Sequence, residues 1–367
     1  RNRACDGVGV LVKTFVAAFP LNLTFSLGEK ECMTASQGHA RPTPDTLPTH
    51  HKTFGYSGEY PGRSMESRQL GKNGLTVPVV CLGAWPLGGG MGEIPDEQAI
   101  ATIHASIGAG VNFIDTAEGY RTSEAVLGKA IKGRRNDVIL ATKLSGDHSP
   151  EHMSSAIENS LHALGTDYID LYQLHGPRPE YPIEETMASL LKLRDDGKIR
   201  YIGISNFSSE QHAEAARFGP VHSSQPRYNM FHRTAEESVL PTCLELGIGV
   251  IPHSPLAKGM LTGKYRPGHI FAGDDERAGK LEFKDDQFNV AYPIVERLIE
   301  WASGHGRDGA QLAIAWTLAH PAVTSCIAGA KTPEQAIHNA SAGDWRLTSG
   351  DMAEISEILG DFQLKSA

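Results

Sequence analysis

Residues 113–120 read FIDTAEGY and join a short strand-like run to two ionisable side chains. The β-branched and aromatic run at 111–114 predicts a buried strand. Asp115 then stands at the carboxyl end of this strand, and Tyr120 lies in the loop beyond it. The stretch therefore places an acid and a phenol at one end of one strand.

Two later strand-like runs end in the same way. Residues 138–142 (VILAT) lead into Lys143, and residues 168–174 (YIDLYQL) lead into His175. Because the carboxyl ends of parallel strands meet at one edge of a sheet, adjacent strands here would bring the four polar side chains together. We expect one site built from three consecutive strand ends.

These four side chains suit proton transfer to or from a carbonyl oxygen. A phenol has a pKa near 10, and a nearby ammonium such as that of Lys143 lowers it, while Asp115 keeps the lysine charged. His175 would hydrogen-bond the same oxygen and orient the substrate. Taken singly, a loop tyrosine, a helix-capping aspartate, a surface lysine and a core histidine are the simpler interpretations. Their joint occurrence at three strand ends favours a site.

Composition excludes some classes of function. The chain has 367 residues, 40% of them hydrophobic, and a net charge of -9, which argues against a nucleic-acid surface or an anionic-membrane binder. Its five cysteines are widely spread and contain no CxxC pair. This pattern indicates reduced thiols and a cytoplasmic protein.

The first 64 residues differ from the rest of the sequence. The apolar run 8–27 contains Lys13 and Pro20 and falls short of a transmembrane helix, and a secretory signal is the weaker alternative for the same reason. Residues 34–64 are rich in Pro, Gly, His, Ser and Thr, which predicts disorder. We expect a disordered extension over 1–64 and a folded domain over 65–367.

From residue 68 onwards strand-like and helix-like patterns alternate. A turn at 71–74 predicts a β-hairpin before the main fold. Eight strands are expected, at 79–82, 111–114, 138–142, 168–174, 201–204, 222–225, 249–251 and 323–327. Helices are expected from Asp96 as the cap to 107, and at 123–131, 150–164, 183–193, 209–216, 235–246, 290–303, 309–319, from 333, and at 348–359.

Repeated βα units in this number predict an α/β protein with a parallel (β/α)₈ (TIM) barrel. The N-terminal hairpin and the last helix fall outside the count of eight units. Active sites of such barrels lie at the C-terminal rim, where the four side chains are expected to meet.

Two other interpretations fit less well. An open nucleotide-binding sheet requires G-x-G-x-x-G between a strand and a helix. The cluster at 88–92 has Glu93 in place of the third glycine, the cluster at 108–110 also lacks it and follows a helix, and the cluster at 7–9 lies in the N-terminal extension. A metal-dependent barrel hydrolase using His175, His222 and His253 generally needs an H-x-H pair on the first strand, which is missing.

Several motifs occur in an order that resembles the aldo-keto reductase superfamily, over about residues 68–359. They are LGAW (82–85), FIDTAEGY, ATK (141–143), LYQLH (171–175), IGISNF (202–207), QPRY (225–228), HSPLAKGMLTGKY (253–265) and the segment 329–339. Within the superfamily, the stretches ending in Arg233 and Tyr265 resemble the bacterial general-stress branch and the potassium-channel β subunits.

The resemblance implies roles for many residues. Tyr120 would be the general acid, assisted by Lys143 and Asp115, with His175 positioning the carbonyl. Ser205, Asn206 and Gln225 would bind the nicotinamide carboxamide of the cofactor. The remaining cofactor-binding residues that the resemblance implies are Ala84, Trp85, His253, Ser254, Pro255, Leu256, Ala257, Lys264, Gly329, Lys331, Gln335 and Asn339.

The implied cofactor is NADP. Residues 254–264 would wrap the pyrophosphate, and Lys331 at the start of a helix favours the 2′-phosphate of NADPH over NADH. Two departures from the family stand out: His253 replaces the usual aromatic residue before SPL, and the loop after Tyr120 is short.

The resemblance therefore implies an enzyme that reduces aldehydes or ketones to alcohols, or the reverse. Its expected partner is a small-molecule carbonyl or alcohol, with no nucleic acid and no membrane. The alternative is a non-catalytic NADP-sensing subunit on the same barrel. His175 favours the enzyme, because channel-associated relatives carry asparagine at that position.

Overall fold

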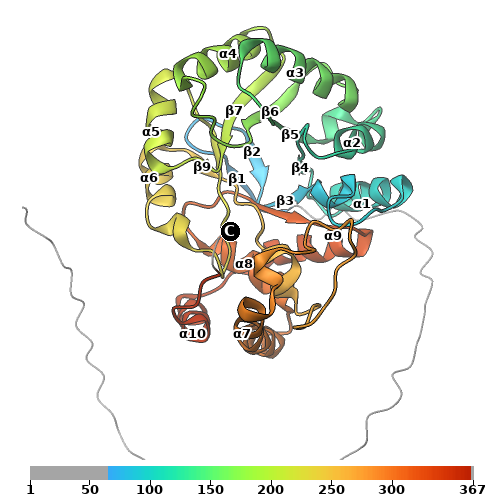
Figure 1. Ribbon diagram of the computed structural model, residues 1–367, viewed down its shortest axis with the longest axis vertical. Coiled ribbons are helices and arrows are strands. Elements are labelled where there is room, and N and C mark those ends of the chain that lie inside the picture. Colours follow the sequence, from blue (N-terminus) through green and yellow to red (C-terminus); the bar gives the residue numbers. More distant parts are fainter. Residues whose placement is uncertain (1–64, 365–367) are drawn as a thin grey trace, which may run out of the picture. The chain divides into compact units, whose positions relative to one another are not determined.

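A computed structural model describes residues 65–364 of the chain (Figure 1). The disorder expected over 1–64, and the cysteines Cys5 and Cys32, lie outside these described residues. None of the helices within 65–364 has the length and apolar character that crossing a membrane requires.

Eight parallel strands form the centre of the fold. Their spatial order is β10-β3-β4-β5-β6-β7-β8-β9. The two ends of this row meet through bridges that pair Val250 with Val323 and His253 with Ile327, which closes the sheet into a barrel. The strands are β3 (Val80–Gly83), β4 (Phe113–Asp115), β5 (Ile139–Leu144), β6 (Ile169–Leu174), β7 (Ile199–Ser205), β8 (Ser223–Gln225), β9 (Gly249–Val250) and β10 (Cys326–Gly329).

Helices surround the strands on the outside, as Figure 1 shows. They are α1 (Asp96–Gly108), α2 (Ser123–Ile131), α3 (Pro150–Leu164), α4 (Ile183–Asp195), α5 (Ser209–Phe218), α6 (Val239–Leu246), α7 (Asp285–Gly304), α8 (Gly309–Ala319), α9 (Pro333–Ala340) and α10 (Ser349–Leu359). Every strand of the barrel is followed by a helix, so the expected (β/α)₈ architecture with an additional C-terminal helix is confirmed.

The predicted hairpin closes the N-terminal end of the barrel. Strand β1 (Ser67–Gln69) pairs antiparallel with β2 (Thr76–Pro78). Leu70 and Val77 of the hairpin are fully buried in the interior cluster, together with Phe113 of β4. Because this end is plugged by apolar side chains, a ligand can enter only at the opposite, C-terminal end.

Alternation along the strands sends side chains in two directions. Phe113 packs inside the barrel, whereas its neighbour Ile114 packs outward in the layer shared with the helices. Strands buried on both faces read as continuous apolar runs, which explains the sequence pattern. Helix α8 is buried almost all round and is apolar on every side.

The structure corrects four details of the expected elements. Asp96 does not cap α1: Pro95 is the N-cap, and the Asp96 carboxylate instead pairs with Lys129 at 2.6 Å. The helix expected over 235–246 is broken into a 3₁₀ turn (Thr234–Glu236) and α6.

The other two corrections concern strand β10 and helix α7. Strand β10 starts at Cys326 rather than at 323, because the amides of Thr324 and Ser325 both bond the carbonyl of Val250 before pairing with β3 begins. Helix α7 starts at 285 rather than at 290, since Phe288 is buried on the same face as the residues one and two turns later.

Candidate active site

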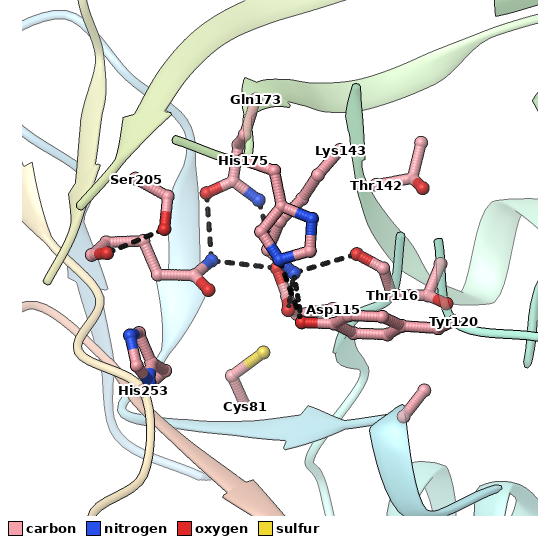
Figure 2. Close-up of polar contacts among 12 residues, drawn as sticks. Cys81, Asp115, Thr116, Tyr120, Thr142, Lys143, Gln173, His175, Ser205 and His253 are labelled. Atoms are coloured by element: carbon pink, nitrogen blue, oxygen red, sulfur yellow. Dashed lines mark hydrogen bonds and ion pairs between the residues drawn. The ribbon is translucent and has the colours of Figure 1, made fainter. Parts of the chain in front are cut away.

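Four polar side chains meet at the C-terminal rim of the barrel, as their places at strand ends predicted (Figure 2). Asp115 ends β4, Lys143 lies near the end of β5, and His175 directly follows β6. Lys143 Nζ is 2.5 Å from Asp115 Oδ2 and 3.3 Å from the Tyr120 hydroxyl, which is 3.4 Å from His175 Nε2. The four groups form a continuous chain from a buried carboxylate to the imidazole.

The ammonium of Lys143 is fully buried and fully paired. Its three hydrogens have three acceptors: Asp115 Oδ2, the carbonyl of Thr116 at 2.8 Å and the Tyr120 oxygen. Burial lowers the pKa of Lys143, but the Asp115 carboxylate and Tyr120 raise it, and the net direction is upward. Lys143 therefore stays positively charged.

The pKa of Tyr120 is raised, whereas the sequence interpretation expected it to be lowered. Burial raises it, and this effect exceeds the opposing effect of the Lys143 ammonium, so the net direction is upward. The lowering of this pKa that was expected from Lys143 is present, but it is smaller than the effect of losing water, which the sequence interpretation did not count. The phenol keeps its proton at neutral pH.

His175 is held in a neutral form. Burial and the nearby Lys143 lower its pKa to about 4. Its Nδ1 is 2.8 Å from the hydroxyl of Ser145, and its ring meets that of Tyr120 edge-on at 5.4 Å. Trp85 contacts the other side of Tyr120, with ring centroids 4.7 Å apart.

Two glutamines, one of them not anticipated from the sequence, hold the second oxygen of Asp115. Gln173 and Gln225 each donate to Asp115 Oδ1 at 2.9 Å, and Gln225 also donates to Gln173 Oε1. Gln173 is missing from the sequence interpretation, although it shares the inward face of β6 with Leu171. The signal available in the sequence was a glutamine within an apolar strand, at a position whose side chain points into the barrel.

Residues expected to bind a carboxamide lie beside this network. Ser205 donates to the carbonyl of Gln225 at 2.8 Å, and Asn206 Nδ2 donates to the carbonyl of His175 at 3.1 Å. Within the described part of the chain, no hydrogen bond is found for Gln225 Oε1, and Gln225 lines the cavity. Asn206 has a φ of 61°, the left-handed conformation that asparagine tolerates.

A cavity of about 990 Å³ runs from this network across the rim. Its walls include most residues that the sequence assigned to the site: Trp85, Asp115, Tyr120, His175, Ser205, Asn206, Gln225, His253, Ser254, Pro255, Leu256, Lys264, Gly329, Lys331, Gln335 and Asn339. Three assigned residues, Ala84, Lys143 and Ala257, are buried behind its walls instead.

The far end of the cavity lies at the N-terminus of α9. Lys331 Nζ donates to the carbonyl of Met91 at 2.6 Å, and its backbone amide donates to Gln335 Oε1. Burial and the charge of Arg277 lower the pKa of Lys331. Asn339 bonds the carbonyl of Gly329, which fixes its amide against β10.

A strap formed by residues 272–284 crosses the rim and was not anticipated. Glu276 bonds the carbonyl of Gly90, and the amide of Glu93 bonds Asp274. Arg277 anchors the strap by donating to the carbonyl of Lys258 at 3.2 Å and to the hydroxyl of Tyr265 at 2.8 Å. The sequence holds no strand or helix period here that would have indicated this crossing.

His253 is half-buried, and its imidazole lies between two rim side chains. Burial, with Lys143 and other cations, lowers its pKa to about 3. Its Nδ1 contacts Ser254 Oγ at 2.9 Å, and its Nε2 contacts Asn206 Oδ1 at 3.0 Å. The three histidines of the hydrolase alternative do not meet: His222 precedes β8 and so lies at the opposite end of the barrel from His175 and His253.

Known proteins are similar to this chain over most of its length. A model of the Aldo/keto reductase family matches residues 79–360. The aldo-keto reductase YhdN of Bacillus subtilis is 39% identical over 310 residues, covering 80% of this chain and 94% of that protein. An NADH-specific methylglyoxal reductase of Escherichia coli is 32% identical over 326 residues, covering 80% and 99%. The solved structure of a glycerol dehydrogenase from Gluconobacter oxydans has a TM-score of 0.73 at 32% identity, covering 80% and 94%.

Proposed function

Because the chain belongs to the aldo/keto reductase family, an oxidoreductase family, we propose that it interconverts carbonyl compounds and alcohols with NADP(H), using Tyr120 as the general acid. The observation that carries this proposal is the chain of contacts from Asp115 through Lys143 and Tyr120 to His175 in the wall of one cavity. A carbonyl oxygen beside the Tyr120 hydroxyl and His175 Nε2 would receive a proton there.

The hydrogen count around Tyr120 supports its role. Lys143 donates to the phenol oxygen, so the phenol hydrogen is left to point at a substrate. When the Tyr120 hydroxyl gives its proton to the substrate oxygen, a phenolate forms on Tyr120, and the buried ammonium of Lys143 stabilises this negative charge. Asp115, fixed by two amides and one ammonium, keeps Lys143 charged throughout.

The cavity fits a nicotinamide cofactor, which when bound supplies or accepts the hydride. Gln225 Oε1 can accept the carboxamide hydrogens, and Ser205 and Asn206 lie beside it. The buried N–H of Trp85 also lacks a partner among the described residues and stands in the cavity wall. Lys264 and the N-terminus of α9 line the far part, where anionic groups would be stabilised.

We propose NADP rather than NAD as the cofactor because of Lys331. Its ammonium donates one hydrogen to the carbonyl of Met91, and its other two hydrogens are available to a 2′-phosphate at the cavity wall. Lys264 adds a second positive charge to the same wall. The relative from E. coli is named as NADH-specific, so the choice between the two cofactors needs its own test.

Substituting Tyr120 with phenylalanine tests the acid directly. The variant keeps the ring that packs on Trp85 and removes only the hydroxyl, so the fold and cofactor binding should persist. We expect kcat for the best aldehyde in a carbonyl panel to fall by about 10² to 10⁴, the usual contribution of general acid catalysis. NADPH oxidation is followed optically, and cofactor binding by protein fluorescence.

The matched control is Tyr292→Phe, which removes a phenol hydroxyl from α7 on the outer layer. It should retain full turnover. A folded Tyr120→Phe protein that binds NADPH and turns over at a near-normal rate would remove Tyr120 from the mechanism. A wild-type protein that binds NADPH but reduces nothing in the panel would favour the nucleotide-sensing alternative.

A further inference from the structure

Ser145 lies directly behind the imidazole of His175. Its Oγ is 2.8 Å from His175 Nδ1, the ring nitrogen that faces away from Tyr120. Among residues 65–364, this nitrogen is the one protein atom in hydrogen-bond contact with the Ser145 hydroxyl. The hydroxyl can therefore donate its hydrogen to Nδ1, provided that this nitrogen carries none of its own.

The backbone of Ser145 is held on both sides. Its amide donates to the carboxylate of Glu118, and its carbonyl accepts from His152 Nε2 at 3.1 Å. Glu118 belongs to the same loop as Tyr120, so this contact couples the loop of the phenol to the residue behind the imidazole. Gly119 leaves room for the serine, since a Cβ at this position would stand only 3.0 Å from Ser145 Oγ.

The direction of the Ser145 hydrogen bond matters for the phenol. A neutral imidazole carries one hydrogen, on either Nδ1 or Nε2. If Nε2 were unprotonated, the Tyr120 hydroxyl would donate its hydrogen to Nε2 across 3.4 Å. That hydrogen would then be unavailable to the substrate. If Nε2 carries the hydrogen, both Nε2 and the phenol can donate to one substrate oxygen.

We propose that Ser145 is a positioning residue that donates to His175 Nδ1 and thereby keeps the hydrogen of the imidazole on Nε2, facing the substrate oxygen. This inference deepens the proposed carbonyl reduction and rests on it for its catalytic consequence. The tautomer itself is a property of the protein without substrate. It can therefore be measured independently of turnover.

Ring nitrogen NMR of the full chain reads the tautomer. Protein labelled with ¹⁵N-histidine at neutral pH gives resonances from 16 histidines, and those of His175 are identified by their loss in His175→Asn. We expect wild-type Nε2 to be protonated and Nδ1 to show the shift of an unprotonated, hydrogen-bonded nitrogen. Ser145→Ala should move the Nδ1 resonance, and Ser145→Thr, which keeps a hydroxyl, should restore it.

Kinetics supply the second readout. Loss of one orienting hydrogen bond should reduce kcat of Ser145→Ala by about tenfold while leaving KM and NADPH affinity close to wild type. Ser145→Thr should recover most of the rate. Ser155→Ala is the control, because this exposed serine on α3 bonds one group within the described residues, the carbonyl of His152.

Two results overturn the inference: a wild-type His175 protonated on Nδ1, or a Ser145→Ala protein with unchanged ring resonances and unchanged kcat. If no carbonyl in the panel is reduced by any variant, the proposed function fails, and the NMR comparison still decides the tautomer assignment.

Discussion

At the scale of single residues, the site depends on a buried charge pair that the barrel cannot easily do without. Asp115 and Lys143 are 2% and 0% exposed, and their charges meet at 2.5 Å. Removing one partner of such a pair leaves the other charged, buried and unpaired, which typically costs about 3–5 kcal/mol. The pair is therefore a constraint on stability as well as on the proposed chemistry.

This constraint predicts non-additive effects on stability. Asp115→Asn and Lys143→Met should each lower the free energy of unfolding by about 3–5 kcal/mol, because each strands one buried charge. The double variant should lose less than the sum of the two, since no uncompensated charge remains. Urea denaturation followed by circular dichroism measures all three. Additive losses would show that the two groups do not stabilise each other.

Sequence reasoning located the four rim residues but not the residues that hold them. Asp115, Lys143 and His175 follow apolar strands, and this pattern can be read from the chain. Gln173 and Ser145 contact them from neighbouring strands, and such contacts depend on the register between segments about 30 residues or more apart. The alternation of side chains along a strand was the usable clue, because residues two positions apart share a face. Gln173 lies two positions before His175, and Ser145 lies two positions after Lys143.

At the scale of elements, the order of strands and helices was predictable, whereas their ends were less so. Helices α2 and α3 match their predicted bounds, and α3 begins at a side-chain cap, since the hydroxyl of Ser149 accepts from the amide of His152. Strand β10 could not be placed correctly, because Val323 and Thr324 are β-branched residues typical of strands, yet the amides of Thr324 and Ser325 share one carbonyl of β9, that of Val250. The pairing partner, rather than local propensity, sets where that strand begins.

Helix α9 carries the element-scale prediction, which concerns the choice of cofactor. Lys331 stands just before the N-cap Thr332, where the helix dipole also favours an anion. A charge-assisted hydrogen bond to a 2′-phosphate contributes roughly 1.5–3 kcal/mol, or about tenfold to a hundredfold in affinity. Lys331→Ala should weaken NADPH binding by about this factor and leave NADH almost unchanged in fluorescence titrations.

The control for charge alone is Lys132→Ala, which removes an exposed lysine at the end of α2. Both titrations should be repeated at high salt, where a solvent-accessible phosphate contact weakens. Equal losses for the two cofactors in Lys331→Ala would mean that the lysine acts through its bond to Met91 and the local structure. No loss for either cofactor would remove the basis for assigning NADP.

At the scale of the whole molecule, the barrel within the described residues is complete. The ends of the strand row are joined by the bridges at Val250 and His253, so no strand is missing from the ring. This closure was predictable, because eight βα units leave one compact parallel arrangement. The position of the strap at 272–284 was not predictable, since it depends on contacts that Arg277 makes with Lys258 and Tyr265 from within an irregular segment.

The hairpin ties the start of the described region to this barrel. Arg68 donates to the carbonyls of Leu318 and Val323, and Met65 packs against the core. Leu70 lies fully buried inside the plugged end. These contacts locate the point up to which the chain should be removable without loss of the fold.

A chain that begins at Met65 should therefore fold as the full chain does. The sequence of 1–64 predicts no contribution to the core, so we expect the thermal midpoint to shift by less than about 2 °C, equivalent to under about 1 kcal/mol for a domain of this size. A chain that begins at Gly71 instead removes β1 and Leu70, which should cost at least the roughly 2–5 kcal/mol of a large buried side chain. Differential scanning calorimetry of the three chains makes the comparison. If the chain from Met65 becomes insoluble or loses its cooperative transition, residues 1–64 belong to the folded domain, and the proposed domain boundary is wrong.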